Sequence, residues 1–234
     1  MSPISYNLQA VQERIDAAAR AALRDPQGVR LLAVSKTFGP DAVIDAAGAG
    51  QRAFGENYLQ EAVDKMAAVR DARPDLSLEW HFIGPIQSNK TRPIAEHFDW
   101  VHSVDREKIA HRLSEQRPDS LPPLNICLQV NISGEASKSG MAPEEVPALA
   151  KAVAGLPRVV LRGLMAIPEP AEDMERQRAP FRQLRELFEQ LKAEGLALDT
   201  LSMGMSADMD AAIAEGATIV RVGTAIFGQR TYAK

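Results

Sequence analysis

A lysine near the beginning of the chain stands where an amine could do covalent chemistry. In residues 31–37, LLAVSKT, Leu32, Val34 and Lys36 share one face of a predicted strand, because successive side chains of a strand point to opposite faces. Lys36 therefore extends an apolar face, where partial desolvation lowers the pKa of an amine and frees it for Schiff-base formation. The alternative is a lysine that reaches solvent at a strand end, and this fragment alone is equally compatible with both.

The last predicted strand ends in residues suited to phosphate. In residues 219–228, IVRVGTAIFG, Arg221 and Gly223 share a face, and an arginine inside a strand needs an acceptor. Gly223 and Thr224 then offer backbone N–H groups and a hydroxyl at the strand end, which suits a phosphate group. The alternative is a glycine that ends the strand and a threonine that caps a helix.

A second hydroxyl comes from the preceding strand. Ser206 lies in LSMGMSADMDAAI, residues 201–213, ahead of a helical pattern, and its simpler role would be a helix N-cap. In a barrel of alternating strands and helices, phosphate groups often bind after strands seven and eight. Ser206, Gly223 and Thr224 fall there, and together with Lys36 they predict a ligand that carries an aldehyde and a phosphate.

Other polar residues at predicted strands carry weaker signals. Asn57 is the last residue of the segment FGEN (54–57), which closes the second predicted strand, and it could reach the same ligand. A role in a turn is the equal alternative. His81 and His102 lie within strands, where we expect packed, hydrogen-bonded histidines. We interpret Cys127 as a small buried residue and not as a nucleophile.

The elements that must position these residues alternate along the chain. Ser2 and Pro3 are typical of an N-cap and first helical residue, and they begin a helix expected to end near residues 25–26. Strands are predicted at residues 30–35, 52–55, 78–83, 100–104, 124–131, 159–166, 199–203 and 218–222. Helices are predicted at 41–47, 58–69, 107–116 (with Asp105 as N-cap), 143–154 and 174–194 (with Gly195 at the C-cap), and a helix at 88–96 is interrupted by Pro93.

Eight strands with intervening helices favour a parallel sheet, at about 29 residues per strand–helix unit. We therefore expect residues 1–234 to form one α/β domain, a single (β/α)8 TIM-type barrel with an extra N-terminal helix. An open doubly wound sheet is the alternative.

Composition excludes several other classes. The 234 residues are 45% hydrophobic and 25% charged, as in an ordinary globular protein, and the net charge of −4 gives no basic field for nucleic acid. One cysteine excludes an internal disulfide framework and fits the reducing cytoplasm. The N-terminus lacks the pattern of a signal peptide, and no apolar run is long enough to span a membrane.

The sequence resembles the pyridoxal phosphate homeostasis protein family over nearly its whole length. The motifs that carry the resemblance are AVSKT (33–37), FGENYLQE (54–61), WHFIGPIQSNK (80–90), SVD (103–105), LQVNIS (128–133), KSGM (138–141), GLMAI (163–167), MGMSADMDAAI (203–213) and GATIVRVGTAIFG (216–228). The resemblance implies a barrel like the N-terminal domain of alanine racemase.

Site roles follow from the resemblance, residue by residue. It implies that Lys36 holds pyridoxal 5′-phosphate as an aldimine and that Arg221 faces the pyridine nitrogen. It assigns the phosphate to Ser206, Gly223 and Thr224. Asn57 matches an asparagine near the cofactor.

The chain departs from the family at one position. Members often carry a second lysine two residues after the Schiff-base lysine, whereas this chain has Phe38. A handover of cofactor through that lysine is therefore in doubt. Lys138 matches a loop lysine of the family and is a candidate for a secondary or transfer role.

The expected function is cytoplasmic binding, storage or delivery of pyridoxal phosphate, without substrate turnover and with PLP-dependent apoenzymes as candidate recipients. Racemisation would need an acid/base on each face of the substrate. No residue near Lys36 stands out in the sequence as a second such group, and His81 and Tyr58 are the only candidates. The alternatives are a racemase or decarboxylase, a Schiff-base aldolase, and an interaction protein with a vestigial site. The related racemases dimerise through a further domain that follows their barrel. This sequence is expected to lack that domain, so a monomer is expected.

Overall fold

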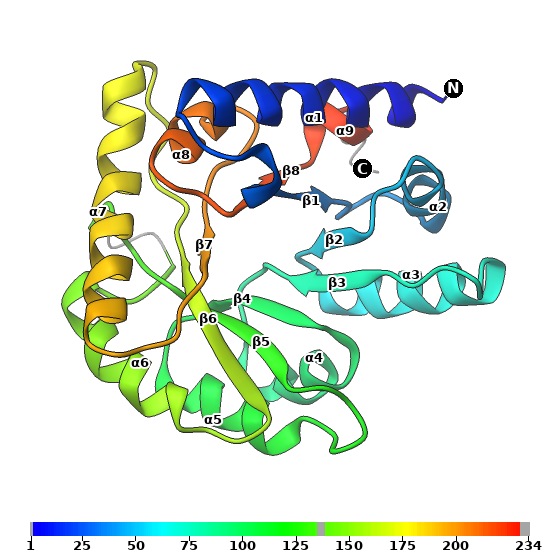
Figure 1. Ribbon diagram of the computed structural model, residues 1–234. Helices are drawn as coiled ribbons and strands as arrows, with labels where there is room; N and C mark the ends of the chain where they lie inside the picture. The colour runs from blue at the N-terminus through cyan, green and yellow to red at the C-terminus, as the bar shows by residue number, and fades with distance from the viewer. Residues whose placement is uncertain (1, 135–138, 230–234) are drawn as a thin grey trace.

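Eight parallel strands close a barrel in the computed structural model, which describes residues 2–134 and 139–229 (Figure 1). Each strand pairs with the next one in the sequence, and β8 pairs with β1. The strands are β1 Arg30–Val34, β2 Ala53–Glu56, β3 Glu79–Phe82, β4 Trp100–Val104, β5 Leu124–Gln129, β6 Val159–Met165, β7 Thr200–Ser202 and β8 Ile219–Val222. The predicted TIM-type barrel is confirmed, and each predicted strand matches an observed one.

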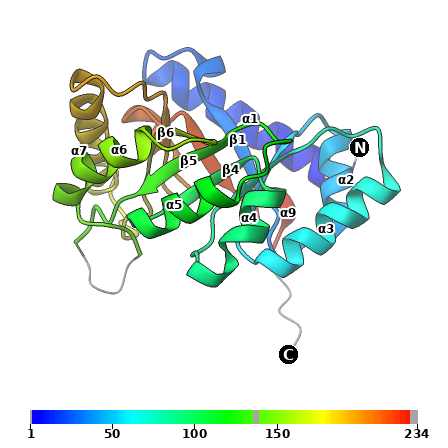
Figure 2. The ribbon, with the colours of Figure 1, turned by 90° about the horizontal axis from the view of Figure 1, so that it is seen from below.

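Helices surround the strands, as the second view shows (Figure 2). They are α1 Pro3–Ala21, α2 Pro40–Gly48, α3 Leu59–Ala72, α4 Thr91–His97, α5 Glu107–Gln116, α6 Val146–Ala154, α7 Met174–Ala193, α8 Met209–Ala214 and α9 Thr224–Phe227, with 3-10 turns at Pro26–Gly28, Ser88–Lys90 and Pro143–Glu145. The extra helix α1 packs against α2, α8 and α9. None of the helices in the described part has the length and apolarity needed to cross a bilayer.

Local signals explain most helix ends. The Ser2 hydroxyl accepts the Ser5 N–H at the start of α1, as expected of an N-cap. Gly195 follows α7 with a φ of +98°, the left-handed conformation that suits glycine just after a helix. The prediction of Asp105 as a cap was wrong, because Arg106 precedes α5 and no side chain caps that helix. Pro93 does not break α4, since it is the third residue of the helix, where its missing N–H has no partner to lose.

Apolar side chains fill two layers. One layer lies between the strands and the helices. The other fills the barrel and comprises Leu32, Ala53, Trp100, Cys127, Met165 and Ile219. Cys127 is fully buried, and burial raises the pKa of its thiol to about 12, so it is a packing residue as predicted.

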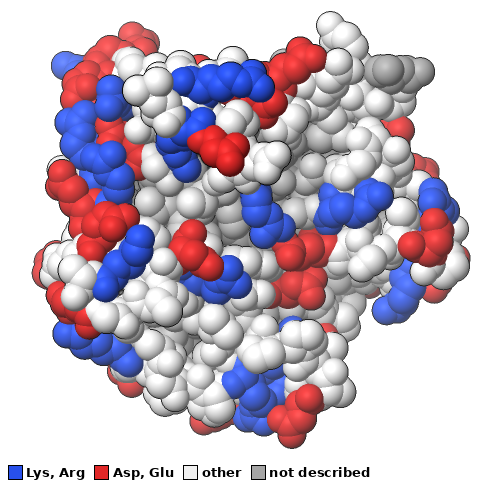
Figure 3. All heavy atoms as spheres, in the orientation of Figure 1, with Lys and Arg blue, Asp and Glu red and all other residues white. Residues whose placement is uncertain are grey.

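The outer surface over α7 is mixed in charge (Figure 3). Three arginines of this helix, Arg178, Arg182 and Arg185, place guanidinium nitrogens 2.7 to 3.3 Å from the carboxylate of Glu215, which is buried directly after α8. These ion pairs join α7 to the segment that leads into β8.

Candidate functional site

A cavity of 280 Å³ opens at the C-terminal ends of the barrel strands, the face where barrels of this type carry their active sites. All six residues predicted from the sequence line it: Lys36, Asn57, Ser206, Arg221, Gly223 and Thr224. The other lining residues are Val34, Ile83, Ile167, Met205 and Ala207. The strand-end rule therefore brought together side chains that are up to 188 positions apart in the sequence.

Lys36 is held through its two neighbours in the chain. It lies just after β1 and continues the interior face of Leu32 and Val34 to the cavity, as the alternation predicted. Next to it, the Ser35 hydroxyl donates a hydrogen bond of 2.6 Å to Glu56 Oε1. On the other side, the Thr37 N–H donates one of 2.7 Å to Glu61 Oε1, and Thr37 has a left-handed φ of +69°. The backbone on both sides of the lysine is therefore anchored.

Lys65 joins these anchors, and the sequence analysis missed it. Its ammonium lies 2.7 Å from Glu56 Oε1 and 3.0 Å from Glu61 Oε1, and it donates to the Ser35 carbonyl at 2.8 Å. Lys65 and Glu56 are both buried. The available signal was a lysine on the inner face of a helix that follows the strand with Glu56, because a buried lysine needs a partner.

Arg221 is the second cation at the cavity, and it is 4% exposed. One guanidinium nitrogen donates to the Ser202 hydroxyl at 2.8 Å, and another donates to the Ala166 carbonyl at 3.0 Å. Burial lowers the pKa of Arg221 to about 10, so the side chain keeps its charge at neutral pH. The acceptor that an arginine within a strand requires is thus present.

The predicted phosphate residues lie at the ends of β7 and β8. Ser206 and Thr224 bring hydroxyls to the cavity, and Thr224 is the first residue of α9. A Cβ on Gly223 would lie 3.1 Å from the Val34 carbonyl oxygen, so glycine allows β8 to approach β1 closely here. Ser206 is not the N-cap of α8, because Asp208 holds that position, which leaves the hydroxyl of Ser206 out of the capping role.

Arg14 fixes the loop that carries Ser206, and it too was missed. From α1 it donates a hydrogen bond of 2.9 Å to the Ser206 carbonyl and contacts Asp210 Oδ1 at 3.0 Å. The sequence held no local signal for this link, since it joins residues 192 positions apart.

Asn57 presents an unused acceptor. Its Oδ1 atom is buried without a hydrogen-bond partner in the structure, and the residue lines the cavity. The backbone of Asn57 is fixed by close packing, because a Cβ on Gly84 would lie 2.2 Å from the Asn57 carbonyl oxygen. A buried acceptor that lacks a partner is costly, so this atom favours a ligand that donates a hydrogen bond.

The remaining candidates lie away from the cavity or outside the described residues. Phe38, which replaces a lysine common in the family, packs on Phe227 with 5.2 Å between ring centroids. His81 is buried inside the barrel, as predicted for a packed histidine, and Tyr58 is half-exposed; neither lines the cavity. Lys138 lies outside the described residues.

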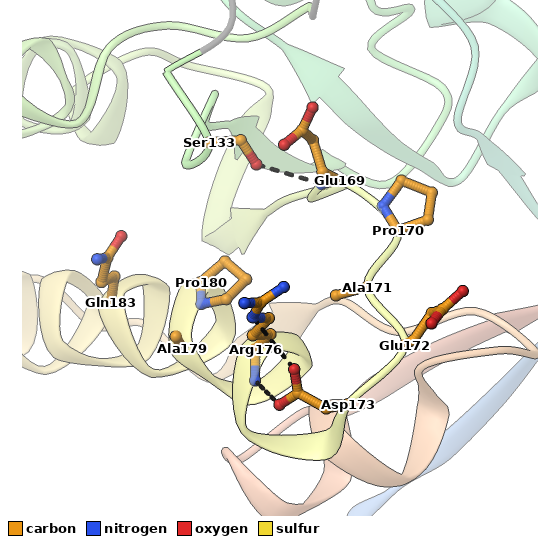
Figure 4. Close-up of a pocket in the computed structure, with 10 residues that line it drawn as sticks. All are labelled: Ser133, Glu169, Pro170, Ala171, Glu172, Asp173, Arg176, Ala179, Pro180 and Gln183. Atoms are coloured by element: carbon orange, nitrogen blue, oxygen red, sulfur yellow. Dashed lines mark hydrogen bonds and ion pairs between the residues drawn. The ribbon is translucent and has the colours of Figure 1, made fainter.

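A larger cavity of 820 Å³ lies beside the N-terminal end of α7 (Figure 4). Its lining is rich in carboxylates, with Glu169, Glu172 and Asp173 around a single cation, Arg176, among the described residues. Asp173 already caps α7 and pairs with Arg176 at 3.2 Å. Three carboxylates repel a phosphate, so the smaller cavity suits the predicted ligand better.

Comparisons with known proteins agree with the predicted family. The model of the alanine racemase N-terminal domain matches residues 6–231. The pyridoxal phosphate homeostasis protein of Pseudomonas aeruginosa is 66% identical over 232 residues, 99% of this chain and 98% of that protein. Its counterpart in Escherichia coli K12 is 55% identical over 234 residues, the full length of both.

A solved structure of the same size also matches. PipY of Synechococcus elongatus PCC7942, solved with PLP bound, has a TM-score of 0.82 and 37% identity, and the match covers 96% of this chain and all of PipY. The chain therefore belongs to the family of pyridoxal phosphate homeostasis proteins, which share the barrel of the alanine racemase N-terminal domain.

Proposed function

We propose that this chain is one barrel domain that binds pyridoxal 5′-phosphate in the cavity at its C-terminal face and maintains the supply of that cofactor in the cytoplasm. When bound, this group supplies an aldehyde that condenses with amines and a pyridine ring that can accept electrons. Lys36 supplies the amine for the aldehyde. The Ser206 and Thr224 hydroxyls, with the backbone at Gly223, bind the phosphate.

The observation that carries this proposal is the set of groups in one cavity: an amine, a guanidinium and two hydroxyls, which come from the ends of the three strands β1, β7 and β8. The unused acceptor of Asn57 fits a ligand that brings a donor to this wall. Arg221 lies on the inner face of β8, where it can meet a ring placed between Lys36 and the phosphate residues. These features fit a small aromatic aldehyde that carries a phosphate.

We further propose that the protein has no substrate turnover of its own. Among the described lining residues, Lys36 and Arg221 are the only ones with titratable side chains, so a second acid/base for the opposite face of a substrate is lacking there. A charged arginine beside the ring nitrogen also disfavours protonation of that nitrogen, which weakens the ring as an electron sink. Both features serve a protein that holds the cofactor.

Two measurements test binding and turnover separately. Borohydride reduction followed by peptide mapping should place the cofactor mass on the peptide that contains Lys36, and mapping mainly to another lysine would contradict the assignment. Incubation with amino acids in deuterated water should give no more deuterium at Cα than free cofactor gives. Faster exchange that is lost in Lys36→Ala would identify a racemase-like enzyme.

Delivery to apoenzymes is the finer part of the proposal. The loaded protein, expected to be a monomer by light scattering, should activate a PLP-dependent apoenzyme while a scavenger destroys free cofactor. Activation that disappears with the scavenger would leave storage as the role of the protein.

A further inference from the structure

A line of polar side chains crosses the interior of the barrel beside the apolar layer that contains Trp100. Glu79 and His81 come from β3, His102 from β4, Ser202 from β7 and Arg221 from β8. His81 stacks on Trp100 of the interior layer, with 5.4 Å between ring centroids and 6° between planes. The line begins at the first residue of β3 and ends at the cavity, so it connects the two ends of the barrel.

Every neighbouring pair in this line is within hydrogen-bond distance. From the cavity inward, Arg221 Nη1 lies 2.8 Å from Ser202 Oγ, which lies 2.7 Å from His102 Nδ1. His102 Nε2 then lies 2.8 Å from His81 Nδ1, and His81 Nε2 lies 2.7 Å from Glu79 Oε1. At the far end Arg30 Nη2 contacts the same oxygen of Glu79 at 2.6 Å.

The two ends of the line fix the direction of every bond. A guanidinium only donates and an ionised carboxylate only accepts, whereas a neutral imidazole has one donor and one acceptor. Glu79 therefore accepts from Nε2–H of His81, which leaves Nδ1 of His81 to accept from Nε2–H of His102. Nδ1 of His102 then accepts the Ser202 hydroxyl hydrogen, so Ser202 offers only lone pairs to Arg221.

Charge is consistent with this arrangement. Burial lowers the pKa of His81, against the raising effect of its hydrogen bond to Glu79, and it lowers the pKa of His102 well below the usual range. Both rings are then neutral at neutral pH, each with a single N–H. With two neutral rings between charged ends, only one set of tautomers satisfies all the bonds.

We propose that Glu79, His81, His102 and Ser202 are positioning residues that form a one-way hydrogen-bond chain and hold the Arg221 guanidinium in place at the cavity. Ser202 and the Ala166 carbonyl together occupy donors on both terminal nitrogens of that guanidinium. These two bonds fix the plane of the Arg221 guanidinium from inside the barrel. They therefore also fix the direction in which its remaining N–H groups can donate to a bound ring. This positioning role rests on the proposed function in one respect: the ring that meets Arg221 is taken to be the pyridine of pyridoxal phosphate.

The chain itself can be tested without any cofactor. Long-range ¹⁵N–¹H spectra of the protein labelled with ¹⁵N-histidine distinguish the two neutral tautomers and the charged ring. We expect His81 and His102 to be neutral Nε2–H tautomers at pH 7. Replacing exposed His97 and His111 one at a time with glutamine assigns their signals by loss. An Nδ1–H tautomer or a charged ring at His81 or His102 would overturn the chain.

The effect on Arg221 needs a ligand that differs only at the ring nitrogen. The 1-deaza analogue of pyridoxal phosphate has a C–H group in place of that nitrogen. The native protein should bind pyridoxal phosphate about tenfold or more tightly than this analogue, as expected for a hydrogen bond to a charged group. In Ser202→Ala the preference should fall at least threefold, because Arg221 loses one of its two anchors.

Ser114→Ala is the matched control. Like Ser202, Ser114 is buried and its hydroxyl donates a hydrogen bond, here to the Pro157 carbonyl, but it lies in α5 outside the barrel. The Ser114→Ala variant should lose stability but keep the native preference for pyridoxal phosphate over the 1-deaza analogue. An unchanged preference in Ser202→Ala would overturn the positioning role. A native protein that binds neither ligand would overturn the proposed function and not the chain, which the histidine spectra test alone.

Discussion

The ammonium of Lys65 lies 2.7 Å from Glu56 Oε1 in a buried ion pair directly behind the strand end that carries Lys36. The pair stabilises charge where water is excluded, and it bonds to Ser35 through both partners. The second carboxylate oxygen of Glu56, Oε2, is buried without a hydrogen-bond partner in the structure. The balance of charges behind the site therefore depends on Lys65.

Lys65→Met should destabilise the protein by about 3–5 kcal/mol, because it leaves the Glu56 carboxylate buried without its cation. Urea unfolding measures the change. Lys151→Met is the matched control, since Lys151 is 59% exposed and its pair with Glu194 at 2.8 Å lies on the surface. The control should lose less than about 1 kcal/mol. Equal losses in the two variants would show that burial of the Lys65 pair carries no special cost.

The same variant should acquire a distinct pH dependence. Burial raises the pKa of Glu56, and Lys65 opposes that rise. Without Lys65 the pKa rises further, so the folded state prefers the protonated acid. The stability deficit of Lys65→Met should therefore be small at low pH and should grow as the pH rises above the ordinary value of 4.5. Urea midpoints between pH 4 and 8 measure it, and a deficit that stays constant would contradict the mechanism.

Loss of either phosphate hydroxyl should weaken binding of pyridoxal phosphate roughly tenfold to a hundredfold, since hydrogen bonds to charged groups contribute about 1.5–3 kcal/mol. Ser206→Ala and Thr224→Ala test this, with pyridoxal as the ligand that lacks phosphate. Ser133→Ala, in the larger cavity, should change neither affinity. Equal losses for the two ligands would mean that these hydroxyls do not bind the phosphate.

Arg14→Met should weaken phosphate binding indirectly. It removes the 2.9 Å hydrogen bond that fixes the Ser206 carbonyl, so the loop must be ordered when the ligand binds. We expect a loss of up to about tenfold for pyridoxal phosphate, the range of one ordinary hydrogen bond, and little loss for pyridoxal. Arg20→Met on the same helix is the control, because Arg20 is exposed and pairs with Asp16 one turn away at 3.6 Å. Similar effects in the two variants would assign the loss to the helix as a whole.

The strands, and the meeting of the candidate site residues at one cavity, were predictable for one physical reason. Parallel strands of a barrel end at one face, so Lys36 and Thr224 could be brought together from their positions in predicted strands alone. Arg14 and Lys65 were missed because each side chain reaches from a helix to a distant segment, Arg14 to the Ser206 carbonyl and Lys65 to Glu56. Hydrophobic periodicity carries no information on such contacts. The line from His102 to Ser202 joins residues 100 positions apart and was equally hidden, although the burial of His102 was expected.

Glu79 should contribute stability that is lost in acid. The hydrogen bond from His81 lowers the pKa of Glu79 to about 2 from the ordinary 4.5, with help from Arg30 and against partial burial. Its contribution is therefore fully present above pH 4.5 and disappears as the pH falls towards 2. Because the side chain is 34% exposed, solvent screening reduces the effect to about 1–2 kcal/mol. Glu79→Gln should be less stable than the native protein at pH 7, and the two urea midpoints should converge between pH 4.5 and 2. Other carboxylates titrate in both proteins, so the difference between the curves isolates Glu79, and parallel curves would show that its charge does not stabilise the fold.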